Sequence, residues 1–118
     1  MWVIMKNTNT VTATLKYALT SDKKMLLLAK FVQWKHVDEA LRILHFTQKR
    51  PAKILHKVIT SAVANAIHNN KMSSDGLIVQ TINVGRGPKL KRMRYASRSK
   101  VHRYVKHRSF VRVVLHSK

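Results

Sequence analysis

The sequence of 118 residues contains no cysteine and only four acidic residues. Without cysteine the chain forms neither a disulfide nor a thiolate metal site. The acidic residues are Asp22, Asp38, Glu39 and Asp75, whereas hydrolysis by two metal ions needs several converging carboxylates. None of the seven histidines pairs at helical spacing with another histidine and a nearby acid, as a metal site would require. We therefore expect no enzyme, no metal, no cofactor and no small-molecule substrate.

Long hydrophobic runs are missing as well. The run from Met25 to Ala29 is far shorter than the ~20 residues that cross a bilayer. The apolar start, Met1 to Lys6, is brief and lacks the small-residue cleavage site of a secretory signal. We expect no membrane partner.

Positive charge is what the sequence has in excess. Its 24 Lys and Arg give a formal net charge of +20. The densest part spans residues 85–112 and contains no acid; its cations are Arg86, Lys89, Lys91, Arg92, Arg94, Arg98, Lys100, Arg103, Lys106, Arg108 and Arg112. Like charges repel by roughly 0.5–1 kcal/mol per close exposed pair, whereas a polyanion that they neutralise releases counterions. The composition predicts a nucleic-acid partner.

Hydrophobic periodicity predicts the elements before this basic stretch. Residues 11–17 alternate as a strand, with an inner face of Val11, Ala13, Leu15 and Tyr17. A helix capped by Thr20 or Ser21 follows to about residue 34, with an apolar face of Met25, Leu28, Phe31 and Val32. A short helix covers residues 37–46, with Val37, Ala40, Leu41 and Leu44 at helical spacing.

The next helix has the clearest pattern. It starts at Pro51, which suits a first helical position, and its core stripe is Ile54, Leu55, Val58, Ile59, Ala62, Val63, Ala66 and Ile67. The pair Asn69-Asn70 is predicted to end it in left-handed geometry.

Two strands flank the basic stretch. Residues 77–84 present Ile78, Ile82 and Val84 on one face, and residues 111–115 present Val111, Val113 and Leu115. A hairpin arm over about residues 85–110 would reach on the order of 30 Å. The predicted fold is α+β: three helices packed on a small three-stranded antiparallel sheet with a long protruding β-hairpin, forming one domain over residues 1–118.

Two motifs connect this pattern to a known family. Residues 61–70 read S-A-V-A-N-A-I-H-N-N, similar to S-A-x-A-N-A-x-H-N, and residues 87–92 read G-P-K-L-K-R, like G-P-x-L-K-R. With these motifs the chain resembles the large ribosomal subunit protein twenty-two family over Val11 to Leu115. The resemblance implies a non-catalytic α+β protein that binds large-subunit rRNA, contacts neighbouring large-subunit proteins, aids assembly, and lines the nascent-peptide exit tunnel with its hairpin.

The sequence departs from the family at three places. The family's S-P-R-K reads Ser21-Asp22-Lys23-Lys24, Ser99 replaces a tip glycine, and Tyr95 stands where proline is common. These departures and the scarcity of acids favour a ribosome in an organelle, a mitochondrion or plastid, over one in bacterial cytoplasm. A free basic nucleoid-associated or RNA-chaperone protein is the alternative, because it needs the same charge but no fixed hairpin.

Candidate site residues follow from the charge and the resemblance. We expect rRNA contacts from Lys23, Lys24, Asn65, His68, Asn69, Arg86, Gly87, Lys89, Lys91, Arg92, Arg94, Arg98, Lys100, Arg103, Lys106 and Arg108. The residues expected to face the tunnel, and with it the nascent peptide, are Ser97, Arg98, Ser99, Lys100 and His102.

For several of these positions two roles stay open. Tyr95, His102 and Tyr104 could stack on bases or pack across the hairpin. Gly85 and Gly87 could let the backbone approach RNA closely or form a plain bulge.

Overall fold

The computed structural model describes residues 9–118, so the start of the chain lies outside the described residues. An edge strand is followed by three helices and then by four strands. One single-turn 3₁₀ helix precedes the second strand, and another follows the third strand. The elements are β1 (Thr10–Ala18), α1 (Asp22–Val32), α2 (Val37–Phe46), α3 (Arg50–His68), η1 (Ser74–Gly76), β2 (Leu77–Arg86), β3 (Leu90–Tyr95), η2 (Ser97–Ser99), β4 (Val101–Lys106) and β5 (Ser109–Ser117).

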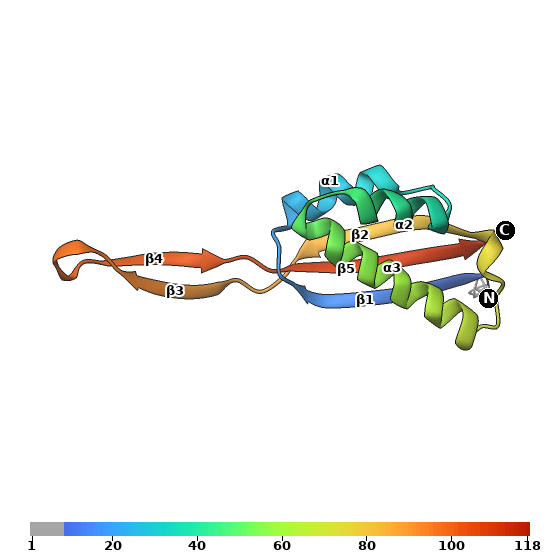
Figure 1. Ribbon diagram of the computed structural model, residues 1–118. Coiled ribbons are helices and arrows are strands. Elements are labelled where there is room, and N and C mark those ends of the chain that lie inside the picture. The colour runs from blue at the N-terminus through green and yellow to red at the C-terminus, as the bar shows by residue number, and fades with distance from the viewer. Residues whose placement is uncertain (1–8) are drawn as a thin grey trace, which may run out of the picture.

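Two antiparallel sheets organise these elements. The first has the strand order β1-β5-β2, and its inner face is covered by the three helices (Figure 1). The second consists of β3 and β4 alone and continues the β2–β5 hairpin beyond the helices as a protruding arm. This arrangement confirms the predicted α+β fold.

The core lies between the helices and the three-stranded sheet. From the helices it takes the fully buried Met25, Leu44, Leu55 and Ile59, and from the sheet Val79, Val111, Val113 and Leu115. The stripe on α3 is confirmed as core, with Leu55, Val58, Ile59, Ala62 and Ala66 buried. Ile67, at the end of the stripe, is 41% exposed.

Two side chains predicted to face the core do not, because of irregularities in the strands. The β1–β5 register shifts between Leu15 and Ala18, so Ala18 is buried and Tyr17 is 63% exposed. The β2–β5 register shifts between Val79 and Thr81, so Leu77 and Val79 face the core in place of Ile78. Beyond the shift Ile82 is buried as predicted.

The helix ends also differ from the predictions. Helix α1 stops at Val32, buries Ala29 and leaves Phe31 61% exposed. Trp34 then adopts a positive φ of 66° and donates its backbone N–H to the carbonyl of Val79. At the end of α3 Asn69 stays right-handed, and the left-handed residue is Lys71, with φ 51°.

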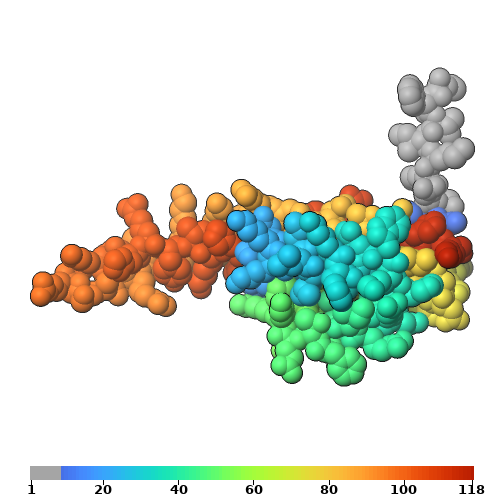
Figure 2. All heavy atoms as spheres, turned by 90° about the horizontal axis from the view of Figure 1, so that it is seen from above, coloured from blue at the N-terminus to red at the C-terminus, as the bar shows by residue number. Residues whose placement is uncertain are grey.

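The arm makes the molecule elongated. The extents are 62 × 43 × 23 Å and the radius of gyration is 17.7 Å, against roughly 13–14 Å for a compact chain of this length. In Figure 2 the arm projects well beyond the domain.

Candidate nucleic-acid interface

The arm is a regular antiparallel ladder, from the pair Leu90 and Lys106 to the pair Tyr95 and Val101. All of β4 is exposed, and so is all of β3 except Leu90, which is half-buried. The cations therefore surround a two-stranded ribbon that has no core of its own. Such a ribbon is marginally stable in water, and its exposed charges are accessible along its whole length.

The root of the arm is a close contact between two backbones. Gly87 donates its N–H to the carbonyl of Arg108 at 2.9 Å. A Cβ at Gly87 would lie 3.0 Å from that carbonyl group, whereas a Cβ at Gly85 would meet nothing closer than Phe110 at 3.9 Å. Glycine at position 87 thus permits close approach within the chain itself.

An ion pair joins the same root to helix α1. The Arg86 Nε lies 3.3 Å from an Asp22 carboxylate oxygen. Burial raises the pKa of the Asp22 carboxyl, but hydrogen bonds from Arg86 and from backbone N–H groups, with the charge of Arg86, outweigh it and hold this pKa below its ordinary value. Asp22 is the first residue of α1 and stands where the family has proline. Proline and an acid are both favoured at the first position of a helix, so the exchange keeps a residue that suits the helix start.

The aromatic residues of the arm divide between the two roles left open. Tyr104 packs across the hairpin, with the Arg94 guanidinium 5.7 Å from its ring centroid. Tyr95 is 85% exposed, so its ring is accessible for stacking on a base. His102 is exposed and pairs with Arg94 in the ladder.

The tip of the arm is a tight turn. Ala96 donates its N–H to the carbonyl of Lys100 at 2.7 Å, and both Arg98 and Ser99 have φ of 58°. This left-handed conformation favours glycine, which explains why glycine suits the position that Ser99 occupies. The predicted tunnel-facing residues Ser97, Arg98, Ser99, Lys100 and His102 are all exposed here.

The structure does not bring all the predicted site residues together. Lys23, Lys24 and Arg86 lie at the root of the arm, whereas Asn65, His68 and Asn69 lie on the last turns of α3, at the far end of the domain (Figure 1). His68 and Asn69 are exposed, but Asn65 donates its Nδ2 hydrogen to the Thr12 carbonyl at 3.3 Å. Asn65 therefore ties α3 to β1, a role that was not predicted.

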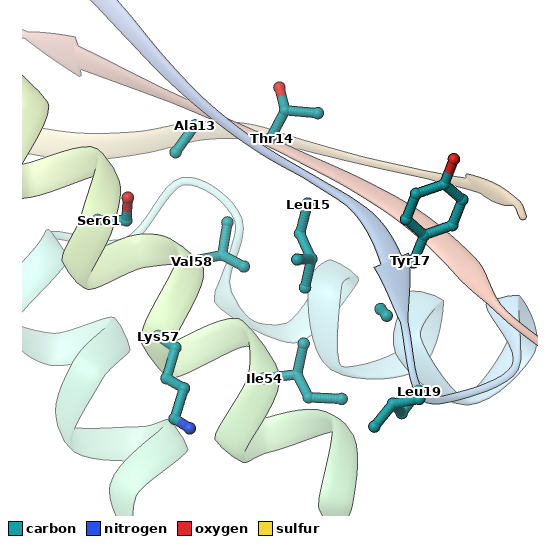
Figure 3. A pocket seen from close by; sticks show the side chains of 10 residues that line it. Ala13, Thr14, Leu15, Tyr17, Leu19, Ile54, Lys57, Val58 and Ser61 are labelled. Carbon is teal, nitrogen blue, oxygen red and sulfur yellow. The ribbon is translucent and has the colours of Figure 1, made fainter.

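An apolar groove lies on the opposite side of α3 from α2, against strand β1. It has a volume of about 400 Å³, and Figure 3 shows Leu15, Ile54 and Val58 pointing into it, with Lys57 at its side. Its lining contains no carboxylate and no histidine, and its polar side chains are Thr14, Tyr17, Lys57 and Ser61. Within residues 9–118 the structure has no cluster of three or more metal-ligating side chains and no helix long and apolar enough to cross a membrane.

The sequence predictions missed a group of residues beside the arm root. Thr20, Arg50 and His107 line a hollow together with Lys24, Lys106 and Arg108. The sequence around Arg50 could have indicated a binding role, because Arg50 is the first residue of a helix whose first turn has no acid. No local signal places residues 20, 50 and 107 side by side.

A small α+β domain with a long cationic hairpin defines a class of basic, arm-bearing proteins suited to polyanionic surroundings. Over residues 13–116 the chain matches the family described as ribosomal protein L22p/L17e. It is also 40% identical over 113 residues to the large ribosomal subunit protein uL22 of Caldicellulosiruptor saccharolyticus, covering 92% of this chain and 93% of that protein. The chain therefore belongs to the ribosomal protein L22p/L17e family.

Membership of this family favours a structural role in translation over a free nucleoid-associated or RNA-chaperone protein. The predicted organelle location gains no support, because this relative is bacterial.

Proposed function

We propose that the protein is a structural constituent of the large ribosomal subunit that binds large-subunit rRNA, aids its assembly and lines the nascent-peptide exit tunnel with the tip of its arm. The observation that carries the proposal is the arm itself, whose strands β3 and β4 are exposed almost throughout and hold cations without a single acid. Neighbouring large-subunit proteins and the nascent peptide are the further partners.

The division of labour follows from the geometry. Lys and Arg along the ribbon neutralise phosphates and give affinity without reading sequence. The small side chains of Ser97 and Ser99 suit a narrow passage at the turn, where Arg98 and Lys100 can reach back to RNA. The globular domain, with its core between the sheet and the helices, supports the arm from outside the tunnel.

Salt dependence tests the rRNA proposal. With 6–10 phosphate contacts, affinity for large-subunit rRNA should fall by roughly 10³–10⁵ between 50 and 200 mM salt, by analogy with duplex DNA. Filter binding over that range measures the slope. A flat response would show that phosphate contacts do not dominate.

Deleting the tip tests the tunnel proposal. Particles reconstituted with a chain that lacks residues 97–100 should assemble, because the arm's base and the domain keep most of the phosphate contacts, but nascent-chain stalling or the response to macrolides should change. Ser99→Gly serves as the control that keeps the turn. Normal assembly with unchanged stalling and antibiotic response would remove the tunnel role, and failed assembly would make the tip an RNA anchor instead.

A further inference from the structure

A hollow of about 460 Å³ lies where the arm joins the domain. Three segments that are distant in sequence form it: the β1–α1 connection with the first turn of α1, the start of α3, and the end of β4 with the link to β5. They meet at the arm root in Figure 1. We call it the junction pocket, and its polar wall consists of Thr20, Ser21, Lys24, Arg50, Lys106, His107 and Arg108.

The junction pocket is cationic and has no acid in its lining. Lys24, Arg50, Lys106 and Arg108 come from three separate segments, so the fold rather than a local run of sequence brings their charges together. Asp22, the acid in the neighbouring hollow, is engaged by Arg86. Charges gathered in this way repel each other until an anion enters.

The start of α3 adds to the positive potential. A helix N-terminus carries a partial positive charge that normally attracts Asp or Glu, yet the first turn of this 19-residue helix has no acid and begins with Arg50. Its N-cap residue, Lys49, makes no side-chain capping hydrogen bond. A cation is unfavourable for the helix at this end, so Arg50 breaks a local rule in the way functional sites do.

Thr20 supplies an independent sign of a missing ligand. The residue is only 7% exposed and lines the junction pocket. Its hydroxyl group is buried and has no hydrogen-bond partner among the described residues. Buried polar groups are nearly always satisfied. Because Thr20 lines the pocket, a rotation of its side chain would turn this hydroxyl towards an anion bound there.

We propose that the junction pocket binds a phosphodiester group of the rRNA backbone, with Arg50 and Arg108 contacting the phosphate oxygens and Thr20 donating its hydroxyl hydrogen. The inference rests on the proposed rRNA binding and deepens it. Because the pocket spans the domain and the β4–β5 link, the bound phosphate also fixes the direction of the arm. The volume leaves room for the adjoining sugar as well as the phosphate.

The first test uses inorganic phosphate as the probe. Titrated into the full chain at constant ionic strength, it should shift the backbone amide resonances of Thr20, Ser21 and Arg50 along saturating curves. Arg50→Gln should weaken this binding by about tenfold, as expected for a lost charge-assisted hydrogen bond. Arg42→Gln, an equal charge change at an exposed position on α2, should not weaken it.

Thr20→Val keeps the side-chain shape and removes the hydroxyl. It should weaken phosphate binding several-fold without lowering the melting temperature, because the hydroxyl has no partner to lose. Shifts that never saturate, or equal effects of Arg50→Gln and Arg42→Gln, would overturn the site.

The second test uses the rRNA and separates a phosphodiester from free phosphate. The slope of the logarithm of rRNA affinity against the logarithm of salt concentration should become smaller in magnitude by about one in Arg50→Gln, as expected when one phosphate contact is lost. Arg42→Gln should leave this slope unchanged. If the unmodified chain binds rRNA but the two variants have the same slope, the pocket does not hold the rRNA backbone, although the proposed function survives. If the unmodified chain does not bind rRNA, the proposed function itself fails, and this inference with it.

Discussion

Strands β4 and β5 follow each other along the chain, yet they are held in place by different forces. In β5 every second residue from Ser109 to Leu115 is buried, including the core residues Val111, Val113 and Leu115. In β4 every residue is exposed, and the strand is held to β3 by the ladder and by the packing of Tyr104 against Arg94. The comparison shows that one continuous hairpin contains a part buried against the helices and a part without a core of its own. We expect the second part to need a polyanion to hold its shape.

The largest expected effect is on the buried part. Ile59→Asp places an unpaired charge at a fully buried position of α3, and its desolvation costs several kcal/mol, comparable to a total stability of about 5–15 kcal/mol. We expect the variant not to fold, and Val58→Asp to behave similarly. Lys57→Ala, on the exposed side of the same turn, is the control. Circular dichroism melting compares the three, and native-like melting of both Asp variants would show that the stripe is not core.

Hydrogen exchange tests the comparison directly. In the isolated protein the amide hydrogens of residues 111–115 should exchange slowly, with a free energy of opening close to that of global unfolding. The amide hydrogens of residues 91–105 should exchange with little protection. The reason is that the arm lacks buried apolar contacts while β5 is surrounded by them. Bound to rRNA, the arm should become protected. Slow exchange over residues 91–105 in the free chain would mean that the ladder is stable by itself.

A third prediction concerns the boundary between the two parts. Gly87→Ala should destabilise the arm root by about 1–3 kcal/mol, typical of overpacking, because the new Cβ would lie 3.0 Å from the Arg108 carbonyl. Gly85→Ala is the matched control two residues away, where the new Cβ would lie 3.9 Å from its nearest neighbour, the Phe110 side chain. Denaturant unfolding gives the stabilities, and equal stabilities of the two variants would show that the root can shift without cost.

The two parts were also unequally predictable from sequence. Helix α2 has the predicted bounds, because Val37, Ala40 and Leu44 recur at helical spacing and two acids occupy its first turn. The alternation in Val111, Val113 and Leu115 identified the inner face of β5. The basic arm followed from charge density and flanking strands.

What sequence reasoning missed depends on register or on distant contacts. No glycine or proline marks the register shifts in β1 and β2, so the sequence gives no sign that the strands are irregular there. Simple alternation of apolar and polar residues therefore predicted, wrongly, that Tyr17 and Ile78 face the core. The left-handed stop moved from the Asn pair to Lys71 because Met72 donates its N–H to the Ala66 carbonyl at 3.0 Å. The junction pocket joins residues 20, 50 and 108, and only the packed fold brings them together.

The smallest expected effect concerns the ion pair between Asp22 and Arg86, which ties the arm root to α1. Because the folded-state pKa of Asp22 is below its ordinary value, the pair stabilises the fold fully above the ordinary Asp pKa of about 3.9, and this contribution is lost as the pH falls through the lowered value. Asp22→Asn should therefore melt slightly below the unmodified chain at pH 6, and the difference should vanish in acid. High salt should reduce it as well, since the pair is partly exposed.

Asp75→Asn is the matched control for this prediction. It removes the same charge from the exposed 3₁₀ turn η1, where the carboxylate accepts a 3.4 Å hydrogen bond from Ser74. Thermal melts at pH 6 and in acid, each at low and high salt, compare the two variants. A difference at pH 6 that persists in acid would show that Asp22 acts by starting α1 rather than through its charge on Arg86. The arm root would then depend on its backbone contacts, the Gly87–Arg108 hydrogen bond and the adjoining ladder pair of Arg86 and Ser109, and the boundary between the two parts of the hairpin would lie there.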